Sequence, residues 1–592
     1  MKNLLSHKYT PWLLTILFGL AVFLFWRFRY PFALTYQEQL QLFLFDGDYF
    51  CSRMAEPGGF ARYVAEFLMQ FYNSVTMGAL ILAVLYMLVQ RLTWRLMIDH
   101  HLPKTNHYYY ALSFIPAIML WYAMGDESVM LTYVVALLMA LAAALAWRQV
   151  KLVKLVRLVR LVQLAVLLVA IPLLYWLIGP MVLLAALLLM PWMVAVPGRP
   201  WSDGWRYWFY VQAFVYALAL ILLSAHYLPF PMLRVVLGIS YYRFPETMPY
   251  VLMAIPVVIW LMALFIKKLP QPKQWVEWCL VALVAILSVG IWRGLGYDAK
   301  KYDLIEYDYL VRIGDWNGII SKAEQQMPDL PMSVSATNLA LGMTNQLGDR
   351  AFDFYQRGSE GLLPKFERNF ATSQLTGEIY FNLGLVNTAQ RFAFEAMEAI
   401  PNYNKSARVV KRLAETNLIN GQYEVARKYL QMLEKTIFYR PWAQRTLNLL
   451  GDEKAIEAHP LYGKLRQYRL QEDFLFSDRE LDKICGLLFV HNQQNQMAAQ
   501  YLLMMPLLDR DMPRFMSYVK VVQNRIGYNP RHCQEGIAFA FMQQRQQPPK
   551  GVVSPFVLQQ MNDFAQAYSV DKSAAGLNRF RNTAWYYLTV GK

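Results

Sequence analysis

Cysteine is scarce in this chain of 592 residues, which contains only four. They are Cys51, Cys279, Cys485 and Cys533. Their spacing provides neither a disulfide framework nor the paired cysteines of a zinc site. For Cys485 and Cys533 the sequence allows either a disulfide bridge or two unpaired buried thiols, and unpaired thiols are our expectation.

Charge is missing where transport proteins need it. No Asp, Glu, Lys or Arg lies near the middle of the long apolar runs that fill the chain up to about Trp292. Because ion-coupled transporters and proton relays use ionisable groups at that depth, the sequence disfavours a pump or a secondary transporter. After Gly294 the chain also lacks G-x-S-x-G, H-E-x-x-H and a nucleotide-binding loop, which disfavours the enzymes that depend on them.

Long apolar runs dominate the first half of the chain. A membrane-spanning helix needs about 20 apolar residues, and the sequence contains about nine candidate spans. The sequence therefore predicts an all-α protein, with a polytopic transmembrane bundle in residues 1–293, a first outer loop at 30–72, and a soluble helical domain in residues 294–592. The candidate spans are 11–28, 73–90, 108–124, 128–147, 162–178, 181–196, 206–225, 249–266 and 274–292.

The net charge of +16 indicates membrane orientation rather than nucleic-acid binding. Cations are concentrated in alternate loops, which the positive-inside rule assigns to the cytoplasm. We therefore expect an inner-membrane protein, with the bilayer as partner, a cytoplasmic N-terminus and, after an odd number of spans, an extracytoplasmic (periplasmic) C-terminal domain. The cations of the cytoplasmic side are Lys2, Lys8, Arg91, Arg95, Lys104, Arg148, Lys151, Lys154, Arg157, Arg160, Arg199, Arg206, Lys267, Lys268 and Lys273; those of the outer loops are Arg27, Arg29, Arg53, Arg62, Arg234 and Arg243.

The first outer loop combines amphipathic runs with acidic residues. The run from Tyr36 to Leu44 ends at Asp46-Gly47-Asp48, and a second run at 60–71 has apolar residues at helical spacing. Asp46 and Asp48, joined by Glu38 upstream, are candidates to bind a divalent cation against a phosphate or to accept a proton from a hydroxyl. A turn whose aspartates cap a helix or face water explains the same residues.

The second outer loop also carries acids, Asp126 and Glu127, between two apolar runs. Carboxylates at the end of a span are costly unless they reach water or a cation. A hydrated helix cap made by Asp126 or Ser128 and a second acidic contribution to an outer site are both consistent with this turn.

Two arginines lie in the outer loop before the eighth span, on the side where positive charge is rare. Arg234 and Arg243 are candidates to bind the phosphate of a lipid, because guanidinium matches phosphate with two hydrogen bonds. Contact with lipid headgroups, or an ion pair with Glu246, is the alternative.

Beyond Gly294 the sequence predicts pairs of amphipathic helices with short turns. The predicted turns are Leu347-Gly348-Asp349, Gly384 and Asn420-Gly421, and Ala426 is a small residue where two helices would cross. These segments resemble tetratricopeptide repeats over about 300–450, although their spacing departs from the repeat's usual period. The resemblance implies a helical-repeat solenoid that binds a protein or a peptide.

The layout of residues 1–293 resembles the GT-C class of membrane glycosyltransferases, in which acids of the first and second outer loops act on a polyprenyl-phosphate sugar. The resemblance implies catalytic roles for Asp46 and Asp48 and a secondary role for Asp126 and Glu127. The whole chain is also similar to an uncharacterised family of bacterial polytopic proteins with helical-repeat tails.

Two functions remain open on the sequence. One is a transferase that moves a sugar from a polyprenyl-phosphate donor, with the repeat domain binding the acceptor or a partner. The other is a membrane-anchored scaffold without catalysis, whose repeats recruit envelope proteins.

Overall fold

The computed structural model describes residues 10–98, 107–149, 156–189, 203–244, 247–266, 269–270, 272–401, 404–471, 477, 480–522, 525 and 529–591. Helices make up the regular structure of this part of the chain, where extended pairing is limited to two isolated bridges. The all-α prediction is confirmed. Several residues used in the sequence argument lie outside the described residues: Lys2, Lys8, Lys104, Lys151, Lys154, Arg199, Glu246, Lys267 and Lys268.

The chain divides into two compact units. The first consists of Met1–Tyr302 and the short segment Pro401–Asn404, and the second of Asp303–Ile400 and Lys405–Lys592. The division falls inside helix α14, a few residues beyond the change of composition near Gly294.

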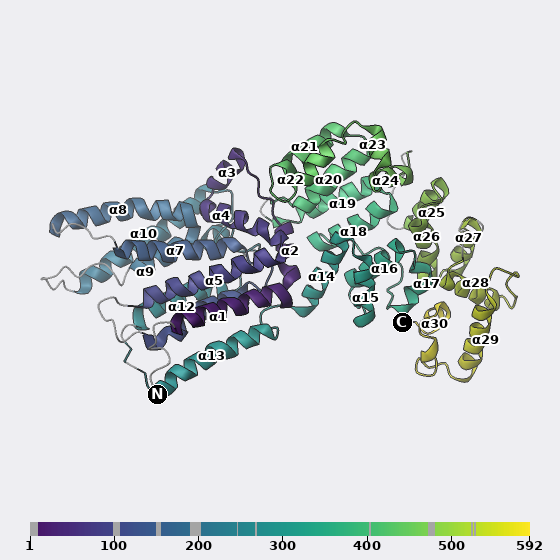
Figure 1. Ribbon diagram of the computed structural model, residues 1–592, viewed down its shortest axis with the longest axis horizontal. Helices are drawn as coiled ribbons and strands as arrows, with labels where there is room; N and C mark the ends of the chain where they lie inside the picture. Colours follow the sequence, from purple (N-terminus) through teal and green to yellow (C-terminus); the bar gives the residue numbers. More distant parts are fainter. Residues whose placement is uncertain are drawn as a thin grey trace. The chain divides into compact units, whose positions relative to one another are not determined.

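The first unit is a bundle of long helices with short helices between them. Helix α1 packs against α5, α5 against α7, and α7 against α8 and α9 (Figure 1). Its elements are α1 (Thr10–Leu24), η2 (Phe25–Arg29), α2 (Pro31–Gln39), α3 (Gly47–Met54), α4 (Gly59–Met69), η3 (Gln70–Asn73), α5 (Val75–Met97), η4 (His107–Phe114), α6 (Ile115–Ala123), α7 (Leu131–Gln149), α8 (Val156–Ile178), η5 (Gly179–Met181), α9 (Val182–Leu189), α10 (Asp203–Tyr227), α11 (Met232–Leu237), α12 (Tyr250–Phe265), α13 (Gln274–Trp292) and the first residues of α14 (Ala299–Ile313).

Fewer helices than predicted are long enough to cross a membrane. Four stretches of the described residues are long and apolar enough to cross a bilayer. By length and composition, the prediction of about nine spans is therefore too high for this part of the chain. The four are Thr10–Arg29, Val75–Met97, Leu167–Leu189 and Trp275–Trp292, and the shorter apolar helices are Tyr109–Ala123, Leu131–Trp147, Val211–Tyr227 and Tyr250–Phe265.

An interrupted helix explains part of this difference. The predicted span 108–124 begins as the 3-10 segment η4 and becomes α-helical only at Ile115. A count of apolar residues does not detect this break, because a 3-10 turn is as apolar as the helix around it. Gly179, with a φ of 64°, separates α8 from α9 where the sequence predicts the fifth span to end, so this second break agrees with the prediction.

The second unit is built from helical hairpins. Helices α18 and α19, and α20 and α21, pair closely, and α19 packs on α20 (Figure 1). The elements that follow α14 are α15 (Trp316–Gln325), α16 (Pro331–Met343), α17 (Leu347–Arg350), η9 (Ala351–Asp353), α18 (Phe370–Leu383), α19 (Val386–Glu398), α20 (Ala407–Ile419), α21 (Tyr423–Glu434), α22 (Arg440–Leu447), α23 (Glu453–Ala458), α24 (Tyr462–Tyr468), α25 (Leu481–His491), α26 (Gln496–Leu508), α27 (Met512–Val522), α28 (Arg531–Gln543), α29 (Pro555–Val570), η12 (Asn578–Phe580) and α30 (Ala584–Thr589).

The same turn recurs inside these hairpins. Gly314, Gly384 and Gly421 follow α14, α18 and α20 with left-handed φ values of 70°, 94° and 76°. In each case the next residue donates its N–H to a carbonyl in the last turn of the helix, which is the Schellman motif. These bonds are Asp315 to Leu310 (3.0 Å), Leu385 to Tyr380 (2.9 Å) and Gln422 to Asn417 (2.8 Å).

Asn345 forms the corresponding turn after α16, with a φ of 56°, and Gln346 donates to Leu341 at 2.7 Å. The turn predicted at Leu347-Gly348-Asp349 therefore lies earlier in the chain. Gly348 instead lies in α17, where a Cβ atom would be 2.5 Å from the Cβ of Pro530. Close approach of two segments, not turn conformation, requires glycine at that position.

Small and apolar side chains fill the second unit. Ala389 and Ala426 are fully buried in α19 and α21, as expected for a small residue at a helix crossing. Cys485 and Cys533 are buried and free, so the expectation of two unpaired thiols is confirmed. Burial raises the pKa of the Cys533 thiol to about 12.

Candidate functional site

One short helix of the predicted first outer loop, α4, buries charged side chains. Arg62 and Glu66 lie one turn apart on α4 and are 3 % and 1 % exposed. The face of α4 that carries them, together with Ala61 and Ala65, is buried, and α4 packs against α7. The aromatic and aliphatic side chains of the second predicted run, such as Phe67, are only half-buried. The polar face of α4 therefore points into the protein.

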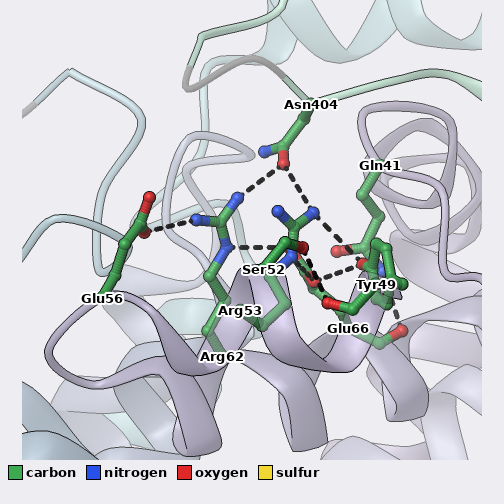
Figure 2. Close-up of polar contacts among 8 residues, drawn as sticks. All are labelled: Gln41, Tyr49, Ser52, Arg53, Glu56, Arg62, Glu66 and Asn404. Atoms are coloured by element: carbon green, nitrogen blue, oxygen red, sulfur yellow. Dashed lines mark hydrogen bonds and ion pairs between the residues drawn. The ribbon is translucent and has the colours of Figure 1, made fainter. Parts of the chain in front are cut away.

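Glu66 is the centre of what we call the arginine–glutamate cluster, formed by Tyr49, Arg53, Glu56, Arg62 and Glu66 (Figure 2). Its carboxylate accepts from Arg53 Nε at 2.7 Å and from Arg62 Nε at 3.0 Å, and it also accepts the hydroxyl of Tyr49. Arg62 Nη1 donates to Glu56 at 2.9 Å. Burial opposes ionisation of Glu66, but the two guanidinium groups outweigh it and hold the pKa of Glu66 below its ordinary value.

Two uncharged residues complete the arginine–glutamate cluster. Asn404, in the short segment that belongs to the first unit, accepts from Arg62 Nη2 at 2.8 Å and from Arg53 Nη2 at 3.4 Å (Figure 2). Gln41 Nε2 donates to the backbone carbonyl of Glu66 at 3.0 Å. The ionised groups of the cluster are thus paired with one another, and a structural role accounts for them.

The predicted acids of the first outer loop are distributed over two helices. Asp46 is half-buried and occupies the N-cap position of α3, and Asp48 is exposed in the first turn of that helix. Carboxylates there are stabilised by the partial positive charge of the helix N-terminus. Glu38 is buried on α2, which ends at Gln39, so no continuous helix connects Glu38 with the two aspartates as the sequence suggested.

The loop that carries Asp126 and Glu127 and the loop that carries Arg243 are joined by a short antiparallel bridge between Val129 and Tyr242. On one side of the bridge the N–H of Arg243 donates to the carbonyl of Ser128 at 3.0 Å. Asp126 accepts the hydroxyl of Tyr242 at 2.8 Å and the N–H of Ser128 at 2.9 Å. No sequence pattern predicts that these two loops meet, because an isolated bridge has no periodic signal.

Glu127 forms an ion pair with Lys301, in the first turn of α14. The Glu127 side chain is 9 % exposed and the Lys301 side chain 53 %. Neither Asp126 nor Glu127 is therefore a simple hydrated cap, because each has a protein partner from a distant part of the chain.

Arg243 differs from Arg62, the other buried arginine among the described residues of the first unit. It is 5 % exposed, and its Nε and Nη1 have no hydrogen-bond partner among the described residues. Burial lowers the pKa of Arg243 to about 10, and the nearby Tyr36, Glu127, Asp126 and Glu66 act against this shift. A buried donor without a partner costs about 1–3 kcal/mol, and more when it is charged. Such a guanidinium is suited to accept an anionic ligand.

Two buried amides occur in the same part of the chain. Gln37 is 1 % exposed and Gln41 4 %, and both amide atoms of Gln37 and the Oε1 of Gln41 have no hydrogen-bond partner among the described residues. Gln37 follows Tyr36, and Gln41 donates to the backbone carbonyl of Glu66. Tyr36 and Glu66 both raise the pKa of Arg243 electrostatically, against the effect of burial.

The second predicted arginine, Arg234, is half-buried on α11, and its guanidinium lies 5.0 Å from the ring centroid of Phe230.

No three His, Cys, Asp or Glu side chains of the described residues come together in a way that could hold a metal ion. The divalent cation suggested for Asp46 and Asp48 thus stays a prediction without a third protein ligand in that part of the chain.

A protein-family model, described as a family of unknown function (DUF6057), matches residues 7–591. The chain belongs to this family. Because the DUF6057 match includes both units, the apolar bundle and the helical hairpins are parts of one family architecture. No curated protein and no solved structure matches the chain.

Proposed function

We propose that this DUF6057 protein is a membrane-embedded transferase that moves a sugar from a polyprenyl-phosphate donor, and that Arg243 binds the phosphate of the donor. The observation that carries the proposal is the buried guanidinium of Arg243, whose Nε and Nη1 have no hydrogen-bond partner in the described part of the chain. Guanidinium and phosphate match in charge and in geometry, and a charge-assisted hydrogen bond is about twice as strong as a neutral one.

The chemistry requires one proton acceptor and one group that stabilises the leaving phosphate. The acceptor hydroxyl attacks the anomeric carbon, its proton passes to a carboxylate, and the bond between that carbon and the phosphate oxygen breaks. Asp46 and Asp48 are the proposed carboxylates, as the layout shared with GT-C enzymes implies. Arg243 compensates the charge that develops on the departing phosphate.

The membrane location and orientation are part of this proposal. Apolar helices long enough to cross a bilayer support an integral membrane protein. The cations of alternate loops support a cytoplasmic N-terminus and an extracytoplasmic second unit in the inner membrane. A lipid-linked donor would then reach Arg243 from the outer side of the membrane.

A scaffold is the second candidate function, and the recurring hairpin turns favour it. The left-handed glycines Gly314, Gly384 and Gly421, and the buried Ala389 and Ala426, support a tetratricopeptide-like array that binds a protein or a peptide. A transferase could use the same surface to bind its acceptor.

Ligand binding tests the proposal. The purified full-length chain in lipid nanodiscs is titrated with a short-chain polyprenyl monophosphate, and wild type is compared with Arg243→Met. Loss of one charged hydrogen bond is worth about 1.5–3 kcal/mol, so we expect the affinity to fall at least about tenfold. Arg29→Met, which removes an exposed cation, is the control and should leave the affinity within about twofold.

Stability separates a binding role from a structural role. An unpaired buried charge destabilises the ligand-free protein, so Arg243→Met should melt at the same temperature as wild type or above it. Unchanged affinity in Arg243→Met, or unfolding of that variant, would contradict the proposed role.

A further inference from the structure

Three carboxylates, those of Glu66, Asp126 and Glu127, favour the charged form of Arg243, and each of them is also bound by another group. Glu66 is held by Arg53 and Arg62 in the arginine–glutamate cluster. The two oxygens of Asp126 accept from Tyr242 and from the backbone of Ser128.

Glu127 is the third of these carboxylates, and its partner is Lys301. Glu127 precedes Ser128, whose carbonyl accepts from the N–H of Arg243 at 3.0 Å, so the two backbones are in contact next to the carboxylate. The carboxylate of Glu127 therefore forms an ion pair with Lys301 and also acts electrostatically on the guanidinium of Arg243. The Nε and Nη1 of Arg243 have no hydrogen-bond partner among the described residues.

Packing fixes the position of Lys301. Its neighbour Tyr302 stacks on Tyr30 with ring centroids 4.3 Å apart, and the hydroxyl of Tyr30 donates to the carbonyl of Gly125 at 3.1 Å. A Cβ atom on Gly125 would be 2.2 Å from the carbonyl oxygen of Gly296, so the loop that carries Glu127 lies against the segment that leads into α14. The ion pair is thus held by its surroundings, unlike most half-exposed pairs.

We infer that Lys301 is a positioning residue of the anion site, because by engaging Glu127 it leaves the guanidinium of Arg243 available to a phosphate-bearing ligand. Without the ammonium group of Lys301, the carboxylate of Glu127 is released, pairs with Arg243 and closes the site. This inference rests on the proposed function and deepens it.

A set of charge variants tests the inference by titration of the full-length chain in nanodiscs with short-chain polyprenyl monophosphate. Lys301→Met frees Glu127 and should weaken binding about tenfold, which corresponds to an internal ion pair of about 1.4 kcal/mol. Lys301→Arg should bind like wild type. The double variant Lys301→Met with Glu127→Gln should return to within about twofold of wild type, because the competing carboxylate is gone.

The control is Lys300→Met, which removes the same charge from the exposed neighbouring residue and should leave affinity unchanged. If Lys301→Met binds like wild type while Arg243→Met loses binding, the positioning role is wrong and the anion site stands. If the double variant is as weak as Lys301→Met, the lysine acts through structure alone and the inference fails. If Arg243→Met binds normally, the proposed function fails and the inference with it.

Discussion

Arg62 and Glu66 form an ion pair of 3.0 Å on the buried face of α4, and both side chains are at most 3 % exposed. The spacing of one helical turn is common on protein surfaces, where such a pair contributes little. Here the pair lies inside the first unit and each member has further partners. Removing the carboxylate of Glu66 leaves Arg53 without an ion-pair partner among the described residues.

We expect Glu66→Gln to destabilise the first unit strongly, because breaking one partner of a buried ion pair costs about 3–5 kcal/mol. Glu56→Gln is the matched control, since Glu56 also pairs with Arg62 but its side chain is 27 % exposed. That change should cost less than about 1 kcal/mol. Thermal unfolding of the purified chain, followed by tryptophan fluorescence, compares the two. Equal melting temperatures for both variants would show that burial of Glu66 contributes nothing.

The pH dependence of the unfolding free energy should show the contribution of the Glu66 carboxylate. The pKa of Glu66 lies below its ordinary value of 4.5 in the folded chain, so its ion pairs stabilise fully above about pH 4.5 and are lost as the pH falls through the folded-state pKa. The stability difference between wild type and Glu66→Gln should be constant from about pH 7 to about pH 5 and shrink at lower pH. Melting curves across this range measure it. If the stability difference between wild type and Glu66→Gln already shrinks near neutral pH, the pKa of Glu66 is raised in the folded chain and the prediction is wrong.

The sequence predicted the helical class, the change of composition near Gly294 and the turns at Gly384 and Gly421. Each of these depends on local chemistry: apolar length, charge, or a residue that tolerates a left-handed conformation. The number of full-length spans could not be predicted in the same way. Breaks such as the one at Ile115 depend on backbone geometry that apolar composition does not reveal.

The sequence did not predict the arginine–glutamate cluster, because it does not show which face of α4 is buried in the protein. The pattern around Phe67 shows that α4 is amphipathic, and the spacing of Arg62 and Glu66 was a signal of pairing. When a helix can lie next to lipid, an amphipathic pattern does not show which of its two faces packs against the rest of the protein. The link between Glu127 and Lys301 connects residues far apart in the chain, for which one sequence contains no signal.

Substitution of the two candidate catalytic acids, Asp46 and Asp48, distinguishes the transferase from the scaffold. Asp46→Asn combined with Asp48→Asn should abolish complementation of a deletion strain if the protein is a transferase, and leave it intact if it is a scaffold. Because Asp48 is exposed and Asp46 half-buried, the melting temperature should change by no more than about 2 °C. Asp563→Asn, an exposed aspartate of α29, is the control and should complement fully. Full complementation by the double variant would remove the transferase hypothesis in its present form.

Orientation is tested with reporter fusions. Alkaline phosphatase joined after Lys592 should be active, because the proposed topology exports the second unit. The same enzyme joined after Met97, in the turn assigned to the cytoplasm, should be inactive, and green fluorescent protein at that point should fluoresce. Cytosolic activity at Lys592 would place the helical hairpins away from a donor on the outer side of the membrane.

The most direct test of the account is a cryo-electron microscopy structure of the full chain in nanodiscs with a short-chain polyprenyl monophosphate. We predict phosphate density at about 2.7–2.9 Å from Nε and Nη1 of Arg243, with Glu127 still paired to Lys301. A ligand bound elsewhere, with the donors of Arg243 directed at the carboxylate of Glu127 or Asp126, would contradict the account.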